Sequence, residues 1–195
     1  METAHDEYKQ GFIDFVNSLN NLETEVAGVL TQQLETVSFK KGEAILEQGS
    51  VCRYVYFMNS GLVKTGFESK ERTFIMRFFA EGNMFTVLDS YLSRQASAYQ
   101  IQALENTVVT RISRSALDDL RTRFHSMETF FSKLLAMASV NMMWRIGEIL
   151  EEQASVRYAN FIKENPGLVQ RISLGDLAAY LGITQVSLSR IRAGR

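Results

Sequence analysis

ISLGDLAAYLGITQVSLSRIRAGR, residues 172–195, is the stretch of sequence that decides the fold. Ser173 is a good cap for a short helix, and Asp176 three residues later gives that helix an acidic first turn. Gly182 allows a left-handed turn, and Thr184 can cap a second helix directly after it. The inner faces of both helices are apolar at helical spacing: Leu174, Leu177, Ala178, Leu181, Ile183, Leu188 and Ile191. Two short helices joined by a tight turn predict a helix-turn-helix motif.

The outer face of the second helix carries polar and basic residues and no acidic residue, which suits insertion into the major groove of DNA. The residues that we expect to contact DNA are Thr184, Gln185, Val186, Ser187, Ser189, Arg190, Arg192 and Arg195. Residues 157–195 hold six Lys or Arg against two acidic residues, whereas residues 1–156 hold 15 against 20, so the positive charge gathers at this end. The alternative is a plain helical hairpin that closes a bundle and never meets DNA.

The composition is that of a globular protein, since 46% of the 195 residues are apolar and the net charge is −1. The sequence begins METAHDEYKQGF, which is polar and acidic, and no apolar run reaches the ~18 residues of a membrane span. We therefore expect a cytoplasmic protein without a signal peptide. Cys52 is the single cysteine and is expected to be a small core residue rather than a redox or metal ligand. No nucleophile, metal or phosphate-loop spacing accompanies His5 or His125, so we expect neither an enzyme nor a metal or cofactor site.

The spacing of the apolar residues changes from a helical period to a period of two at Glu35, and it returns to a helical period in the C-terminal part of the chain. Over residues 7–34 they recur every three or four positions, which predicts two amphipathic helices. From Glu35 the period becomes two, with glycines at the turns, and this predicts an antiparallel barrel or sandwich. The predicted strands cover residues 54–58, 62–67, 72–79, 98–104 and 107–112. Asn59-Ser60-Gly61 and residues 68–71 are hairpin signals between successive strands.

A long helix is predicted from Ser126 to about residue 159, and it carries two apolar stripes. One stripe is Phe130, Leu134, Met137 and Trp144, and the other is Phe131, Leu135, Ala138, Met142, Ile146 and Ile149. Two stripes need two partners, so we expect the β domain to cover one and the same helix of a second chain to cover the other. The expected dimer interface is Phe131, Leu134, Leu135, Ala138 and Met142, with Asn141 and Arg145 beside it as candidates for setting its register. One wide stripe buried inside a monomer is the alternative.

The combination of a glycine-punctuated β domain, a long helix and a C-terminal helix-turn-helix resembles the Crp/Fnr family of bacterial transcription regulators. The segments that carry the resemblance are FKKGEAILEQGSVCRYVYFMNSGLV, ALENT and LAAYLGITQVSLSRIR. It implies an α+β fold with N-terminal helices and an antiparallel, jelly-roll-like β-roll within an effector domain at residues 1–125. A dimerisation helix and hinge follow at residues 126–164, and a DNA-binding domain at residues 165–195.

The same resemblance implies a homodimer that senses a small signal, binds a palindromic operator on double-stranded DNA and has RNA polymerase as a candidate partner. The principal base-contacting positions of the family fall on Gln185, Val186 and Arg190. The sequence ends at Arg195, where many members continue, so we expect contacts from beyond the recognition helix to be lacking.

The signal that binds is not expected to be cyclic AMP. Members that bind it carry a glycine-glutamate pair and an arginine-serine pair, whereas residues 84–88 here contain no glycine-glutamate and Ser97-Ala98 replace the arginine and serine. Without the arginine, a cyclic phosphate would lose its bidentate ionic partner. The cysteines that hold an iron–sulfur cluster in the oxygen-sensing branch are also missing. The expected effector-pocket residues are Met84, Tyr91, Arg94, Ser97 and Tyr99, and the alternative is that the aromatic and methionine side chains among them fill the roll as core.

The function that the sequence favours is a dimeric, sequence-specific DNA-binding transcription regulator whose effector is unknown. The alternative is a sensor or protein-interaction module that keeps the family fold and has lost operator binding.

Overall fold

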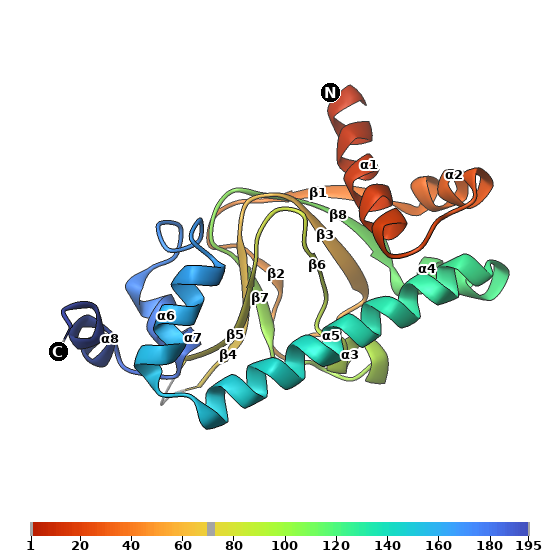
Figure 1. Cartoon of the computed structure of the whole chain (residues 1–195). Helices are drawn as coiled ribbons and strands as arrows, with labels where there is room; N and C mark the ends of the chain where they lie inside the picture. The colour runs from red at the N-terminus through yellow and green to blue at the C-terminus, as the bar shows by residue number, and fades with distance from the viewer. Residues whose placement is uncertain (1, 70–72, 195) are drawn as a thin grey trace.

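The chain folds into two N-terminal helices, a β-roll and a set of C-terminal helices, which follow one another along the sequence (Figure 1). The computed structural model describes residues 2–69 and 73–194. The helices are α1 (Glu2–Leu19), α2 (Thr24–Gln33), α3 (Leu88–Ser93), α4 (Arg114–Arg123), α5 (His125–Glu151), α6 (Ala154–Glu164), α7 (Leu174–Leu181) and α8 (Gln185–Arg192). The predicted pair of N-terminal helices is confirmed, with the break between them at residues 20–23.

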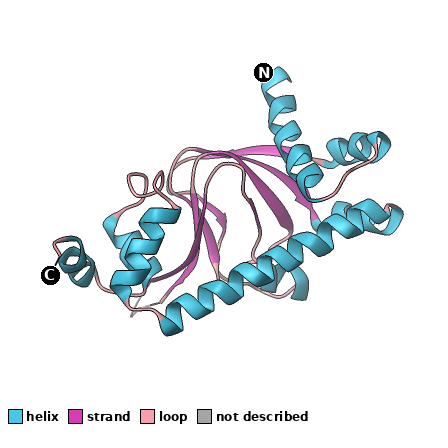
Figure 2. Ribbon diagram, viewed as in Figure 1, coloured by secondary structure: helices cyan, strands magenta, loops and turns pink. Residues whose placement is uncertain are grey.

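The β-roll consists of two four-stranded antiparallel sheets (Figure 2). The first sheet has the order β1 (Glu35–Phe39), β8 (Thr107–Ser113), β3 (Tyr54–Ser60), β6 (Met84–Phe85). The second has the order β2 (Ala44–Leu46), β7 (Gln100–Ala103), β4 (Val63–Glu68), β5 (Thr73–Phe79). The main core fills the roll and extends under α1, α2, α4 and the first turns of α5. The predicted α+β fold with an antiparallel β-roll is therefore confirmed.

One of the two predicted hairpins is wrong. The strands on either side of Asn59-Ser60-Gly61 belong to different sheets, because β3 pairs with β8 and β6, whereas β4 pairs with β5 and β7. Gly61 has φ +101°, and a Cβ there would lie 2.8 Å from the Asn106 carbonyl oxygen. The glycine therefore serves a close crossing from sheet to sheet rather than a hairpin turn. The other predicted hairpin, β4 to β5, is confirmed, although residues 70–72 of its turn lie outside the described ranges.

The predicted long helix is interrupted. α5 ends at Glu151, Glu152 and Gln153 have extended backbone, and α6 begins at Ala154, so the prediction of one helix to residue 159 is wrong. Neither glycine nor proline marks the break. The buried Arg157 side chain donates to the carbonyls of Glu152 and of Leu181, so a tertiary contact replaces the helical hydrogen bonds that are lost here. No helix in the described ranges combines the length and apolar character that crossing a membrane requires.

The C-terminal helices build a second, smaller core. Its buried members are Phe161, Leu177, Ala178, Leu181 and Leu188. Phe78 of β5 packs against this core, with its ring centroid 5.5 Å from that of Tyr180, and α7 lies along β5. The helix-turn-helix thus has a hydrophobic interior of its own and also rests on the edge of the second sheet.

Candidate nucleic-acid interface

The helix-turn-helix is fixed by three local features that the sequence predicts, and all three are confirmed. Ser173 Oγ accepts a hydrogen bond from the Asp176 amide at 3.0 Å, which caps α7. Gly182 has φ 69° and ψ 28°, the left-handed conformation that ends this helix. Thr184 Oγ1 accepts from the Ser187 amide at 3.1 Å and caps α8.

The outer face of α8 is open to solvent. Leu188 is fully buried and Ile191 half-buried, which turns the opposite side of the helix outward. The predicted DNA-contacting residues that are exposed are Thr184, Gln185, Val186, Ser189, Arg190 and Arg192. Ser187 is half-buried, and its hydroxyl lies 2.9 Å from that of Thr184. Arg195 lies outside the described residues. The structure therefore gathers seven of the eight predicted residues on one short helix and its cap.

Val186 places an apolar side chain on this face, where the residue is 63% exposed among polar and basic neighbours. The first turn of α8 has no acidic residue, and Arg190 and Arg192 lie in its last turn. The face therefore offers an amide, an apolar side chain and two guanidinium groups, which are the groups that contact base edges and phosphates in the major groove.

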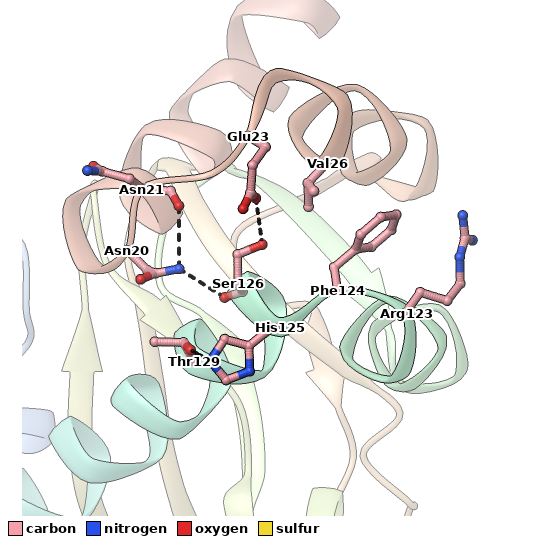
Figure 3. Close-up of a pocket in the computed structure, with 9 residues that line it drawn as sticks. All are labelled: Asn20, Asn21, Glu23, Val26, Arg123, Phe124, His125, Ser126 and Thr129. Carbon is pink, nitrogen blue, oxygen red and sulfur yellow. Dashed lines mark hydrogen bonds between the residues drawn. The ribbon is translucent and has the colours of Figure 1, made fainter.

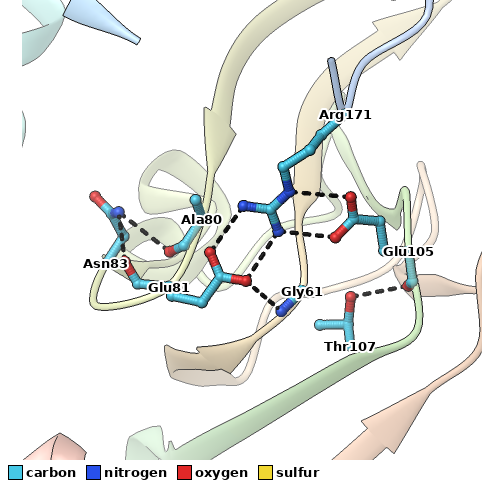
Figure 4. Close-up of polar contacts among 7 residues, drawn as sticks. All are labelled: Gly61, Ala80, Glu81, Asn83, Glu105, Thr107 and Arg171. Carbon is cyan, nitrogen blue, oxygen red and sulfur yellow. Dashed lines mark hydrogen bonds and ion pairs between the residues drawn. The ribbon is translucent and has the colours of Figure 1, made fainter. Parts of the chain in front are cut away.

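A polar clasp, formed by Arg171, Glu81 and Glu105, ties the segment before α7 to the β-roll (Figure 4). Arg171 Nε and Nη2 donate to the two oxygens of Glu105 at 3.0 and 2.8 Å. Its Nη1 and Nη2 donate to the two oxygens of Glu81 at 2.9 and 2.8 Å. These hydrogen bonds from Arg171 hold the pKa of Glu81 at about 2, below its ordinary value of 4.5. No periodic pattern in the sequence predicts this contact, although Glu105 lies within the ALENT segment.

A second ion pair joins the same two parts of the molecule. Lys64 Nζ of β4 lies 2.8 Å from Asp176 Oδ1 of α7, and the two side chains are only 12% and 17% exposed. Beside the pair is a cleft of about 370 Å³ between the β-roll and the helix-turn-helix. Its lining residues are Lys64, Glu68, Thr73, Ser173, Gly175, Asp176, Ala178, Ala179, Ile183 and Gln185. Gln185 is thus both a predicted base-contacting residue and part of the wall of this cleft.

Arg145 connects the long helix to the helix-turn-helix. It is 4% exposed, donates to the Tyr180 carbonyl and to Glu148 Oε2 at 2.6 Å, and lies 3.7 Å above the Tyr180 ring. Arg157 similarly donates to the next carbonyl, that of Leu181, at 2.7 Å. Two buried arginines therefore satisfy the carbonyls at the end of α7. The expectation that Arg145 sets the register between two chains is wrong for the described arrangement, because its side chain is engaged within its own chain.

The five predicted effector-pocket residues differ in their exposure and in the contacts that they make. Met84 is buried in β6, and Tyr91 is 1% exposed with its ring 6.2 Å from Phe131 of α5. Arg94 is a left-handed residue with an exposed side chain that lies 3.9 Å from Asp118 Oδ2 of α4. Met84 and Tyr91 are buried, which fits the alternative prediction that they are part of the core of the roll.

Ser97 and Tyr99 lie where the second sheet begins its β7 strand. Ser97 is buried, exchanges backbone hydrogen bonds with Gly49 and Ser50 at 2.8 Å, and accepts from the Tyr99 amide through Oγ at 2.9 Å. The Tyr99 ring is half-buried, 6.1 Å from that of Phe67. The serine that stands at the expected phosphate-holding position therefore serves to fix its own loop.

The apolar face of α5 that lacks cover lies toward the C-terminal half of the helix. Of the predicted interface, Phe131 is 3% exposed and packs in the core of its own chain, and Leu134, Leu135 and Ala138 are half-buried. Met142 is 40% exposed. The large apolar side chains of α5 that are at least 40% exposed are Met137, Val140, Met142, Met143, Trp144, Ile146 and Leu150. Five of them form what we call the α5 seam: Met137, Val140, Met143, Trp144 and Leu150. Both stripes begin in the core, at Phe130 and Phe131, and both open to solvent in the second half of the helix, where Trp144 is 71% and Ile146 50% exposed.

A polar groove of about 450 Å³ lies where the N-terminal helices meet the start of α5 (Figure 3). Ser126 Oγ donates to Glu23 Oε2 at 2.8 Å, and Asn20 Nδ2 donates to the Ser126 carbonyl at 3.1 Å. A backbone hydrogen bond, and after it the one from Ser126, hold the pKa of Glu23 below its ordinary value. The contacts in this groove fasten the α1–α2 connection to the first turn of α5.

Comparison with known proteins gives a family and a set of similar folds. Residues 36–124 match the family model of the cyclic nucleotide-binding domain. Among solved structures, the chain is similar to FixK2 from Bradyrhizobium japonicum, with a TM-score of 0.72, 21% identity and 83% of each chain covered. It is also similar to a protein assigned to the Crp/Fnr family from Eubacterium rectale, with a TM-score of 0.71, 20% identity, and 89% and 83% of the two chains covered.

A third similar structure is a mutant of CooA from Carboxydothermus hydrogenoformans, with a TM-score of 0.67, 16% identity, and 86% and 78% of the two chains covered. A search of curated protein sequences gives no match. The family model and the solved structures confirm the fold that the resemblance in the sequence implied.

Proposed function

We propose that this chain, which contains a cyclic nucleotide-binding domain and has the fold of Crp/Fnr family regulators, is a dimeric, sequence-specific DNA-binding transcription regulator. The observation that carries the proposal is the outer face of α8, where a capped helix exposes Gln185, Val186 and Arg190 and no acidic side chain. A helix of this kind enters the major groove with its N-terminal residues at the base edges.

Each exposed side chain has a contact that its chemistry favours. The Arg190 guanidinium can donate to O6 and N7 of a guanine, the Gln185 amide can bind N6 and N7 of an adenine, and the Val186 methyl groups can pack on the methyl group of a thymine. Arg192, and Arg195 beyond the described residues, are proposed to contact phosphates, which add affinity without selecting sequence. The hydroxyls of Thr184, Ser187 and Ser189 add polar contacts at the edge of this surface.

The proposed dimer is formed through the α5 seam. Its five large apolar side chains are between 41% and 78% exposed in a single chain, which is more apolar surface than an isolated helix face keeps in water. The side chains at Met137, Val140 and Trp144 recur every three or four residues, the spacing with which two copies of a helix pack against each other. A second copy of this chain is therefore the occupant that fits best, and it would give a two-fold axis.

The proposed effector is a small molecule other than cyclic AMP. Arg94 is 69% exposed and lies beside Asp118, and Ser97 is occupied by hydrogen bonds within its own loop. Neither residue supplies the desolvated cation that would pair with a cyclic phosphate.

Retardation of DNA fragments in gel electrophoresis tests the proposal. A mixture of genomic fragments is titrated with the wild-type protein and with the Gln185→Ala/Arg190→Ala variant, both of which keep the buried Leu188 anchor. We expect the wild-type protein to retard a subset of fragments and the variant to retard none selectively. Equal behaviour of the two proteins would exclude α8 as the recognition helix and would favour a sensor or interaction module that does not bind an operator.

A further inference from the structure

Gly175, the second residue of α7, lies against the side chain of Gln185, the first residue of α8. A Cβ at Gly175 would lie 2.7 Å from Gln185 Nε2 and 3.6 Å from Gln185 Cδ. The first of these distances is shorter than 3.0 Å, so a side chain at this position would not fit unless the Gln185 amide moved away. The residue type at position 175 therefore decides where that amide can lie.

The backbone conformation of Gly175 does not explain why glycine stands there. Gly175 lies within a helix and is not among the glycines with positive φ, so alanine would suit its backbone better. Gly28 of α2 is also helical, but a Cβ there would meet no neighbouring atom within 4 Å. What matters at Gly175 is therefore the missing side chain, because the space that it leaves holds the Gln185 amide.

The Gln185 amide packs against Gly175 but keeps its hydrogen-bonding groups free. Within residues 2–69 and 73–194 it makes no hydrogen bond, and the nearby Ser173 hydroxyl already donates to Asp176 Oδ2 at 2.7 Å. Both the N–H groups and the carbonyl of Gln185 are therefore available to a base. Binding N6 and N7 of an adenine needs both groups in one orientation, and a neighbour that restricts the side chain beforehand lowers the entropy cost of reaching it.

We propose that Gly175 is a positioning residue for base recognition, because its missing side chain lets the Gln185 amide lie across the start of α7 and so sets the orientation from which that amide contacts a base. The inference rests on the proposed function, since it assigns a further determinant of specificity to the same DNA-binding surface. Another explanation for the glycine is close approach of a phosphate backbone to α7, because the first helix of such a motif crosses the backbone. That explanation predicts weaker binding to every duplex alike, whereas the proposal predicts a loss of preference at one base pair.

A double-mutant cycle between Gly175 and Gln185 tests the proposal. The wild-type protein, Gly175→Ala, Gln185→Ala and the double variant each select duplexes from a randomised pool, and the base pair assigned to Gln185 is the one whose preference disappears in Gln185→Ala. We expect Gly175→Ala to lower the preference for adenine at this base pair roughly 3-fold or more and to keep the preference for the guanine that Arg190 contacts. In the Gln185→Ala background, Gly175→Ala should cause no further change, because the side chain that it displaces is gone.

Gly28→Ala is the matched control. It makes the same substitution within a helix and raises helix propensity in the same way, but it displaces no side chain. We expect this variant to select the same motif as the wild-type protein. Gly175→Ala should keep or exceed the wild-type urea midpoint, because only the end of a flexible side chain has to move. A lower midpoint would show that a side chain at position 175 disturbs more than Gln185, which would count against the proposal.

NMR spectroscopy reports the contact itself in the absence of DNA. The side-chain amide resonances of Gln185 are identified by their absence in Gln185→Ala, and in the wild-type protein they should show a nuclear Overhauser effect to the Hα atoms of Gly175. These resonances should shift in Gly175→Ala and stay unchanged in Gly28→Ala. A wild-type protein without this contact would overturn the inference.

The selection experiment separates the inference from the proposed function. If the wild-type protein selects a motif but Gly175→Ala leaves it unchanged, or weakens binding to all duplexes alike, only the inference fails. It also fails alone if Gln185→Ala keeps every base preference of the wild-type protein. If the wild-type protein selects no motif, the proposed function fails and the inference fails with it, even where the NMR contact is present.

Discussion

Gln185, Val186 and Arg190 lie on the exposed side of α8, yet their side chains offer three different kinds of contact to DNA. An amide and a guanidinium each make paired hydrogen bonds to a purine, while valine makes only apolar contact. Arg192 lies in the last turn of the same helix, and we propose that it contacts backbone phosphates. The two arginines are therefore proposed to have separable roles in binding DNA.

The first prediction compares these two arginines. Arg190→Ala should cost ~1–3 kcal/mol of binding free energy on the operator and relax the preference at one base pair, because a bidentate contact to guanine is lost. Arg192→Ala should weaken binding to all duplexes alike and reduce the slope of log affinity against log salt by about one, because one phosphate contact is lost. The measurement is a salt series with operator and random duplexes. If Arg190→Ala loses the same binding free energy on both duplexes, Arg190 contacts a phosphate rather than a base.

The second prediction concerns the protonation of Glu81. Arg171 lowers the folded-state pKa of this carboxyl to about 2 from an ordinary value of 4.5. The Glu81 carboxylate therefore makes its full contribution to the free energy of unfolding above pH 4.5, and this contribution is lost as the pH falls from 4.5 toward 2. The wild-type protein should exceed Glu81→Gln in its urea midpoint at pH 7, and the difference should shrink by pH 3. A difference of the same size at both pH values would contradict the prediction.

At the scale of elements, α5 packs against the core along its first turns, and many of its apolar side chains are exposed along its second half. Phe131 packs against Tyr91 in the core, whereas Val140 and Trp144 face solvent. The break at Glu152 then redirects the chain, so that α6 and α7 return to the β-roll. One helix thus contacts the effector domain, the proposed second chain and, through Arg145, the helix-turn-helix.

The third prediction tests the α5 seam. Val140→Glu/Trp144→Glu should give monomers in sedimentation velocity, because four charges would face one another across the two-fold axis. Val156→Glu is the control, since Val156 is 45% exposed and lies on α6, outside the α5 seam. Leu135 is a poorer site for this test, because it also packs against the core of its own chain. An unchanged dimer would place the interface elsewhere.

At the scale of the whole molecule, two cores are joined by a hinge, by the apolar contact of Phe78 with the second core and by a small set of polar contacts. The main core lies in the β-roll, and the second one holds the helix-turn-helix together.

The fourth prediction concerns the signal. Cyclic AMP at concentrations near physiological ones should give no heat of binding in calorimetry, because Ser97 is engaged in its loop and Arg94 lies at the surface. Arg94→Ala should behave in the same way as the wild-type protein. Tight binding that disappears in Arg94→Ala would show that this arginine reorients to hold the phosphate.

Features set by neighbouring residues could be predicted from the sequence. Ser173, Gly182 and Thr184 act on backbone groups within three or four positions, so their caps and turn follow from residue type and spacing. The two stripes of the long helix were also visible, although the pattern alone did not tell where along the helix they leave the core.

Contacts between distant parts of the chain could not be predicted in this way. Arg171 binds carboxylates 66 and 90 positions away, and no local pattern marks which of the many surface acids it will meet. The assignment of β3 and β4 to different sheets has the same cause, because strand pairing is non-local and the Asn59-Ser60-Gly61 turn is compatible with either outcome.

The most direct measurement is a genomic selection for DNA fragments bound by the full chain, followed by sequencing of the bound pool. The account predicts a two-fold symmetric motif with half-sites ~10–10.5 base pairs apart, centre to centre, because two α8 helices related by a dimer axis lie one turn of B-DNA apart. Each half-site should contain a guanine whose selection is lost in Arg190→Ala. A bound pool without a shared motif, or an asymmetric single site, would contradict the claim that two copies of this chain recognise DNA through α8.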